Sequence, residues 1–238
     1  MTTGLTYSQY VTQIATLAVV EPSDAAFQAI LPQMITYAEN RMYRDLDFLF
    51  TSIATTQYGL TFGSRQISVP SGTFVVPEQI NVITPIGTSN PDAGARNPLL
   101  PCTKEFLDQV YNNSQQVGLP KYFCPFDDYT FLVGPYPDAN YTCEIIGTYR
   151  PNSLSATNTT TFISLYLPDL LIMASMVYVS GYQRNFGRAN DDPQMAVSYE
   201  SQYQTLLKSA MSEENRKKFE SAAWSSQSQS ATASPTRG

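Results

Sequence analysis

The sequence contains no histidine, and it has only three cysteines and one tryptophan in 238 residues. Without an imidazole there is no Cys–His pair to form a nucleophile, and a zinc site is not expected. The cysteines, Cys102, Cys124 and Cys143, are odd in number and include no pair at CxxC spacing, so they do not form a disulfide framework. They indicate buried structural thiols in a reducing compartment.

Charge is also scarce. Charged residues make up 14% of the chain, the net charge is −6 and the pI is near 4.6. The longest basic block is Arg216-Lys217-Lys218, which does not provide the positive face that tight nucleic-acid binding needs. No apolar run reaches the roughly 18 residues of a membrane span, and the N-terminus lacks the features of a signal peptide. We therefore expect no membrane partner.

Helical periodicity marks both ends of the chain. Apolar residues recur at helical spacing over residues 5–20 and 25–49, with Thr6 and Asp24 as N-caps and Pro32 as an expected kink. Further helices are expected from Pro168 and from the Asn190-Asp191-Asp192-Pro193 segment to about Met211. The apolar stripe of the second helix comprises Phe27, Ile30, Leu31, Met34, Ile35, Ala38, Met42, Leu46 and Leu49, and Glu39 is assigned to its polar face.

The middle of the chain has the period of strands instead. Residues 52–60, 65–70 and 73–87 read as strands, and residues 88–98 as a loop. Thr103 is expected to cap a short helix over residues 103–111. Residues 121–151 are predicted to form a small antiparallel meander, with turns at 125–128 and 134–138 and alternating faces over 141–149.

These patterns predict an α+β fold. The N-terminal helices (residues 1–51) and the C-terminal helices (residues 152–220) are expected to form one bundle, with an antiparallel β domain (residues 52–151) inserted between them. Residues 221–238 are rich in Ser, Gln and Ala and are predicted to be a low-complexity tail, either disordered or ordered by a partner. This tail cannot bury Trp224 in a core of its own, so we interpret Trp224 as a residue that anchors the tail on a partner.

Two acidic pairs, Asp127-Asp128 and Asp191-Asp192, allow two interpretations. As paired carboxylates they would suit glycoside hydrolysis or a hard cation. As a turn pair and a helix-capping pair they need no chemistry, and this interpretation is favoured because the sequence shows no partner that would raise the pKa of one carboxyl. No catalytic, cofactor-binding or metal residue is predicted. The Tyr-rich β region leaves open a tail- or capsid-associated carbohydrate-binding module as an alternative function, and a glycan hydrolase is a second alternative.

Three motifs in this order resemble the head-to-tail adaptor proteins of tailed bacteriophages, which include the tail tubular protein of short-tailed phages. The first is YAENRMYRDL at 37–46. The second is GLPKY at 118–122 with LVGPYPD at 132–138 and YTCE at 141–144. The third is YRP at 149–151, followed by LPDLL at 167–171. The resemblance covers about residues 7–207.

The resemblance implies a non-enzymatic structural virion protein that is made in the host cytoplasm. It would form a homo-oligomeric ring of roughly twelve subunits at the neck of the virion. The portal protein would lie on one side and tail or nozzle proteins on the other, with DNA passing through the channel without specific binding. We predict that residues 213–238 are mobile in the free chain and become ordered on the portal. The candidate contact residues are Arg216, Lys217, Phe219 and Trp224.

Overall fold

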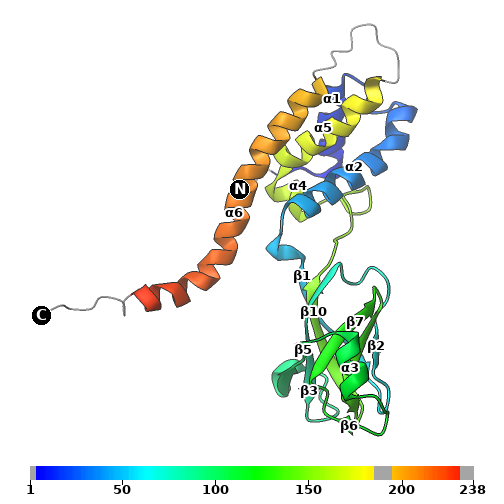
Figure 1. The fold of residues 1–238 in the computed structure, drawn as a ribbon. Coiled ribbons are helices and arrows are strands. Elements are labelled where there is room, and N and C mark those ends of the chain that lie inside the picture. Colours follow the sequence, from blue (N-terminus) through cyan, green and yellow to red (C-terminus); the bar gives the residue numbers. More distant parts are fainter. Residues whose placement is uncertain (1–3, 185–194, 231–238) are drawn as a thin grey trace, which may run out of the picture. The chain divides into compact units, whose positions relative to one another are not determined.

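The structure is a computed structural model that describes residues 4–184 and 195–230 (Figure 1). The expected helix-opening segment Asn190-Asp191-Asp192-Pro193 lies outside the described residues. The chain divides into two compact units, a helical unit of Met1–Leu49 with Pro151–Gly238 and a β unit of Phe50–Arg150. The fold is therefore mixed α+β, as predicted, and the two units are described separately below.

The helical unit contains helices from both ends of the chain. Thr6 caps α1 in a capping box, in which the Gln9 side chain accepts from the Thr6 N–H at 2.9 Å. Asp24 caps α2 by accepting from the Phe27 N–H at 2.8 Å, and Pro168 is the first residue of α5. The helices are α1 (Tyr7–Ala18), α2 (Ala25–Asp45), α4 (Phe162–Tyr166), α5 (Pro168–Arg184) and α6 (Met195–Ser230).

Helix α5 lies at the centre of the helical unit and contacts α1, α2, α4 and α6. The Tyr10 hydroxyl of α1 donates to the Ser175 hydroxyl of α5 at 2.6 Å. The predicted apolar stripe of α2 is buried, with two exceptions. Ile30 is half-buried, and Leu49 is exposed because the helix ends at Asp45, before this residue. The other buried apolar residues of this core include Ile14, Leu31, Ile35, Met42, Leu171 and Met176.

Glu39 was expected on the polar face of α2, but the structure buries it. Its side chain is only 1% exposed, and one carboxylate oxygen accepts the Leu154 N–H at 3.1 Å. Leu154 is itself buried in the segment that leads to α4. Helical spacing alone could not show this, because the partner lies 115 residues further along the chain. Burial raises the pKa of the Glu39 carboxyl, although the Ser153 side chain and the Leu154 N–H oppose the shift.

The β unit contains two four-stranded sheets. One has the order β1-β10-β3-β4 and is antiparallel throughout, whereas the other has the order β2-β8-β7-β5. Short strands β6 and β9 pair in parallel. The elements are β1 (Ser52–Leu60), β2 (Gln66–Ser68), β3 (Val76–Thr84), β4 (Ala95–Pro98), β5 (Leu100–Pro101), α3 (Lys104–Val110), β6 (Val117–Gly118), β7 (Tyr122–Asp127), β8 (Thr130–Gly134), β9 (Tyr136–Pro137) and β10 (Tyr141–Thr148).

The predicted three-stranded meander is wrong in its pairing. Strands β7 and β8 do form a hairpin, but β10 pairs with β1 and β3 in the other sheet. The Pro-containing segment at 134–138 carries the chain from one sheet to the other instead of forming a hairpin. Residues 125–127 also belong to β7, and the turn falls at 128–129. The expected loop at 88–98 ends in strand β4, which pairs with β3.

The core of the β unit lies between the two sheets. Residues 141, 143 and 145 of β10 face this core, as the alternation predicted. Gly147 continues that face at a register shift between β10 and β3, where an added Cβ would lie 2.5 Å from the Val76 carbonyl oxygen. The core comprises Leu60, Ile80, Val82, Tyr141, Cys143 and Ile145 with Ile67, Val69, Leu99, Phe123, Phe131 and Val133.

Candidate functional site

Helix α6 carries all four predicted contact residues, and a polar cluster fixes its N-terminal half to α2. Arg41 donates to both carboxylate oxygens of Glu200, at 2.7 and 2.5 Å. The Arg41 guanidinium also lies 4.1 Å from the centre of the Tyr203 ring, and the Tyr203 hydroxyl donates to Asp45 at 2.7 Å. The hydrogen bonds from Arg41 lower the pKa of Glu200. The cluster therefore joins α6 to α2 by charge-assisted hydrogen bonds.

A second contact fixes α6 near residues 214–218. Glu214 is buried and accepts the Leu49 N–H at 3.4 Å and the Lys217 ammonium at 2.6 Å. Lys217 also lies 5.3 Å from the centre of the Phe162 ring, and Lys218 pairs with Asp47. Although partial burial disfavours its charge, the hydrogen bonds to Glu214 and Glu213 raise the pKa of Lys217. Helix α6 is therefore part of the helical unit at least as far as Lys218.

The structure describes the side chains of two of the four predicted contact residues and only the backbone of the other two. Arg216 is exposed, whereas Lys217 is half-buried and makes the contacts given above. The backbones at Phe219 and Trp224 are helical, and their side chains lie outside the described residues. The role of the four residues as portal contacts stays a prediction.

The length of α6 takes it past its neighbours. Its 36 residues span about 54 Å, whereas the 17 residues of α5 span about 26 Å. Helix α6 therefore continues beyond α5, the helix against which it packs (Figure 1). The sequence pattern predicted a helix only to about Met211 with a charged continuation, and the structure extends it to Ser230.

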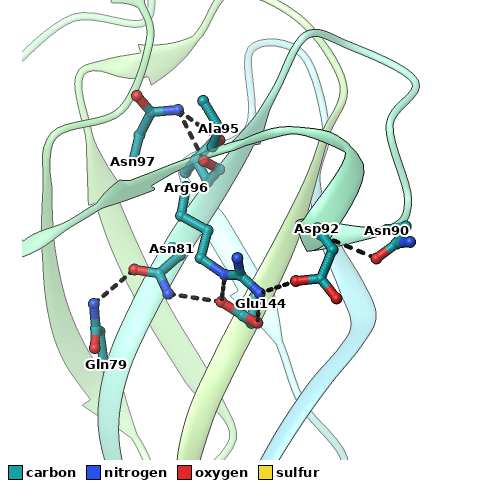
Figure 2. A network of polar contacts seen from close by, with 9 residues as sticks. Gln79, Asn81, Asn90, Asp92, Ala95, Arg96, Asn97 and Glu144 are labelled. Carbon is teal, nitrogen blue, oxygen red and sulfur yellow. Dashed lines mark hydrogen bonds and ion pairs between the residues drawn. The ribbon is translucent and has the colours of Figure 1, made fainter.

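A separate polar network lies on the outer face of the β1-β10-β3-β4 sheet (Figure 2). The buried Glu144 carboxylate accepts from Arg96 at 3.0 Å and from the Asn81 side chain at 2.8 Å. Arg96 also pairs with Asp92 at 2.9 Å, and Gln79 donates to Asn81 at 2.8 Å. The network ties the short η2 turn (Pro91–Ala93) to the sheet. The predicted alternation over residues 141–149 places Glu144 on the side opposite Cys143, but it did not identify the partners of Glu144.

The acidic pair Asp127-Asp128 lies where β7 ends, with Asp127 as the last residue of the strand and Asp128 in the turn to β8. Asp127 accepts the Tyr129 N–H at 2.7 Å, which is the turn role that the sequence predicted. Both carboxylates border a pocket of about 300 Å³ whose wall includes Phe74, Tyr129 and Phe131. The other pair, Asp191-Asp192, lies outside the described residues.

The cysteines are free thiols in the described structure. Cys124 and Cys143 are buried, whereas Cys102 is half-buried. Burial raises the pKa of all three and brings that of Cys143 to about 12, so the thiols stay protonated at neutral pH. In the ranges 4–184 and 195–230, no three Cys, Asp or Glu side chains are grouped to hold a metal. None of the described helices is long and apolar enough to cross a membrane.

The polar clusters described above connect helices and strands within each unit, so the role that they support is structural. Residues 5–231 match the model of the SU10 adaptor protein family, so the chain belongs to this family of phage head-to-tail adaptors. It is a phage adaptor and a structural component of the virion. None of the curated proteins matches the chain.

Proposed function

We propose that the chain is one subunit of an adaptor ring that joins the portal to the tail and forms part of the DNA channel. Family membership over residues 5–231 carries this proposal. The negative net charge supports it as well, because a chain with a net charge of −6 does not retain DNA that slides through a channel. The ring would contain roughly twelve copies, with the portal on one side and tail or nozzle proteins on the other. No catalytic step is part of this function.

The portal contact is assigned to the C-terminal part of α6. This part continues beyond Lys218, the last residue whose contact with the helical unit is described. Arg216 is exposed at its base, and Phe219 and Trp224 follow on the same helix. A buried aromatic anchor stabilises an interface by about 2 kcal/mol or more, and a ring repeats the contact in every subunit.

Assembly on purified portal tests the proposal directly. The full chain should form a stoichiometric ring with portal, visible by negative-stain microscopy and as one sedimenting species. A chain that ends at Lys218, and the Trp224→Ala variant, should bind portal at least about ten-fold more weakly. Lys208→Ala is a matched control, because Lys208 is an exposed basic residue on the same helix before the proposed contact.

Two results would reject parts of this proposal. If the full chain and portal never form a stoichiometric complex, the ring function is wrong. If the chain ending at Lys218 binds as tightly as the full chain, the ring function stands but the portal contact lies elsewhere. Glycan binding or turnover by the purified chain without any ring would favour the alternatives that the sequence left open.

A further inference from the structure

The antiparallel sheet of the β unit has two edges, β1 and β4. Among the described strands, β1 pairs only with β10, and β4 pairs only with β3. Strand β1 is nine residues long and contains neither a charged residue nor a proline. Natural edge strands usually carry such residues because an open edge binds other strands. A nine-residue edge strand without such residues indicates that another strand pairs with β1 in the assembled state.

The backbone groups that β1 presents outward follow from its register. The Tyr149 N–H donates to the Thr51 carbonyl at 2.9 Å, so this opposed pair is hydrogen-bonded. Hydrogen-bonded and non-hydrogen-bonded pairs alternate along an antiparallel ladder. Ser52 and Ala54, opposite residues 148 and 146, are therefore in non-hydrogen-bonded pairs. Their N–H and carbonyl groups point away from β10, toward the open edge.

The same reasoning applies to β4. The Leu99 N–H donates to the Ile80 carbonyl at 2.9 Å, so Pro98 and Arg96 direct their backbone groups away from β3. Pro98 has no N–H at a position where it would face outward, as is usual for proline on an edge strand. The proline limits pairing at this edge but leaves the Pro98 carbonyl and both backbone groups of Arg96 directed outward. The side chain of Arg96 is held by Glu144 and Asp92 (Figure 2), which fixes this part of the edge.

The strand count decides how two copies of this sheet can meet. Neighbouring strands are antiparallel throughout, so the two edges of the four-stranded sheet run in opposite directions. If β4 of a second copy lies beside β1, the two strands are antiparallel when both copies have the same orientation. The second copy therefore does not need to be rotated by a two-fold axis. Such a head-to-tail contact uses different surfaces on the two copies, and it is the kind that closes into rings. Pairing of β1 with β1 would instead end at a dimer.

We propose that the start of β1 pairs with β4 of a second copy of this chain. Ala54 would exchange two hydrogen bonds with Arg96 of the second copy, and the Ser52 N–H would donate to the Pro98 carbonyl of that copy. Ala54 and Arg96 both lie on the face of the sheet that carries Glu144, so this register keeps that face continuous. The register shift after residue 55 ends the regular stretch.

This inference rests on the proposed ring and adds the subunit contact to it. Three backbone hydrogen bonds form a weak contact, so they require the second copy to be held nearby. The portal would hold the copies side by side, and the edges would then pair. The free chain is accordingly expected to keep the β1 edge exposed to water until the ring forms.

Hydrogen exchange of the full chain, free and in complex with portal, tests the contact. The Ser52, Ala54 and Arg96 amides should exchange about ten-fold or more slowly in the ring than in the free chain. The Ile53 amide, which faces β10 in both states, is an internal control. A ring in which the Ser52 and Ala54 amides exchange as fast as in the free chain would overturn this contact but not the adaptor function. The absence of any ring would reject both.

A cross-link gives a second readout that does not depend on exchange. Ser52 and Pro98 are both exposed and would lie opposite each other across the contact. The double variant Ser52→Cys/Pro98→Cys should therefore form a ladder of disulfide-linked multimers in rings on non-reducing gels. The two single variants and the wild-type chain are controls for the native thiols. Dimers alone in the double variant would indicate β1–β1 pairing and would contradict the proposal.

Discussion

At the scale of single residues, Glu39 has one carboxylate oxygen with a hydrogen-bond partner and one without. The first accepts the Leu154 N–H, whereas the second is buried and has no partner among the described residues. A buried carboxylate without full hydrogen bonding is costly in its charged form, and burial accordingly raises its pKa. Glu39 joins α2 to the segment that precedes α4, so its protonation state affects the stability of the helical unit.

Glu39→Gln should make the helical unit less sensitive to pH. Because the native pKa is raised, the native state binds this proton more tightly than the unfolded state does. The resulting stability is full below the unfolded pKa of about 4.3 and is lost as pH rises through the native pKa. The thermal midpoint of the variant, relative to that of the wild type, should therefore increase between acidic and neutral pH. Glu21→Gln, at an exposed glutamate of the same unit, is the control. Parallel pH curves for Glu39→Gln and wild type would contradict this account.

At the scale of elements, local signals predicted the helix caps and the strand β1, because each depends on residues close in sequence. Thr6, Asp24 and Thr103 all cap helices as expected, through bonds to N–H groups three residues away. Strand β4 was missed because the turn-like composition of residues 88–98 hides its pairing with β3. Helix α4 was missed although Thr161 and Ser164 form a capping box at its start, and packing partners far along the chain also stabilise it. The N-terminal segment shows this dependence, since the Leu5 N–H donates to the Ser164 carbonyl of α4 at 2.8 Å.

The portal contact itself stays a prediction, and the sequence indicated only part of the helix that carries its candidate residues. The sequence located Arg216, Lys217, Phe219 and Trp224 near the C-terminus but did not predict that α6 reaches Ser230. The contacts that fix this helix join residues about 160 positions apart, such as Arg41 with Glu200. No helical period or local motif in one sequence identifies such a pair.

The close approach of β3 and β10 predicts a strong effect of a single methyl group. Gly147→Ala would place its Cβ 2.5 Å from the Val76 carbonyl oxygen and 2.9 Å from the Phe74 ring. Backbone must move to relieve this clash, so we expect a loss of roughly 1–3 kcal/mol in the free energy of unfolding. Gly118→Ala is the matched control, since its Cβ would meet only the Pro135 ring at 3.4 Å. Denaturant unfolding should separate the two variants, and equal midpoints would refute the clash.

Truncation of α6 at two points should separate stability from partner binding. A chain ending at Lys218 keeps Glu214 and both lysine contacts, so its thermal midpoint should match that of the full chain. A chain ending at Ser212 loses the hydrogen bond that the Leu49 N–H donates to Glu214 and should be destabilised by roughly 1–3 kcal/mol. This differs from the sequence-based expectation that residues from 213 onward are mobile in the free chain. Equal midpoints for the two truncated chains would show that the Glu214 contacts do not stabilise the unit.

At the scale of the whole molecule, the helical unit is built from two distant parts of the chain, whereas the β unit is one continuous segment. The chain enters the β unit at Phe50 and leaves it at Arg150. Next to these ends, the Tyr149 N–H donates to the Thr51 carbonyl at 2.9 Å, so entry and exit lie side by side. Segments whose ends are close in space are the ones that tolerate excision and insertion.

The β unit should therefore fold when residues 50–150 are expressed alone. It contains its own core between two sheets, and its first and last long strands pair with each other. We expect a cooperative thermal transition and a circular dichroism spectrum dominated by β-structure. A chain in which a short Gly-Ser linker replaces residues 51–149 should retain a cooperative helical transition, because the linker has only the width of one strand pair to span. Gly147→Ala in the isolated segment should lower its midpoint as it does in the full chain. If the isolated segment gives no cooperative transition, the β unit depends on the helices for its stability, and the two units do not fold independently.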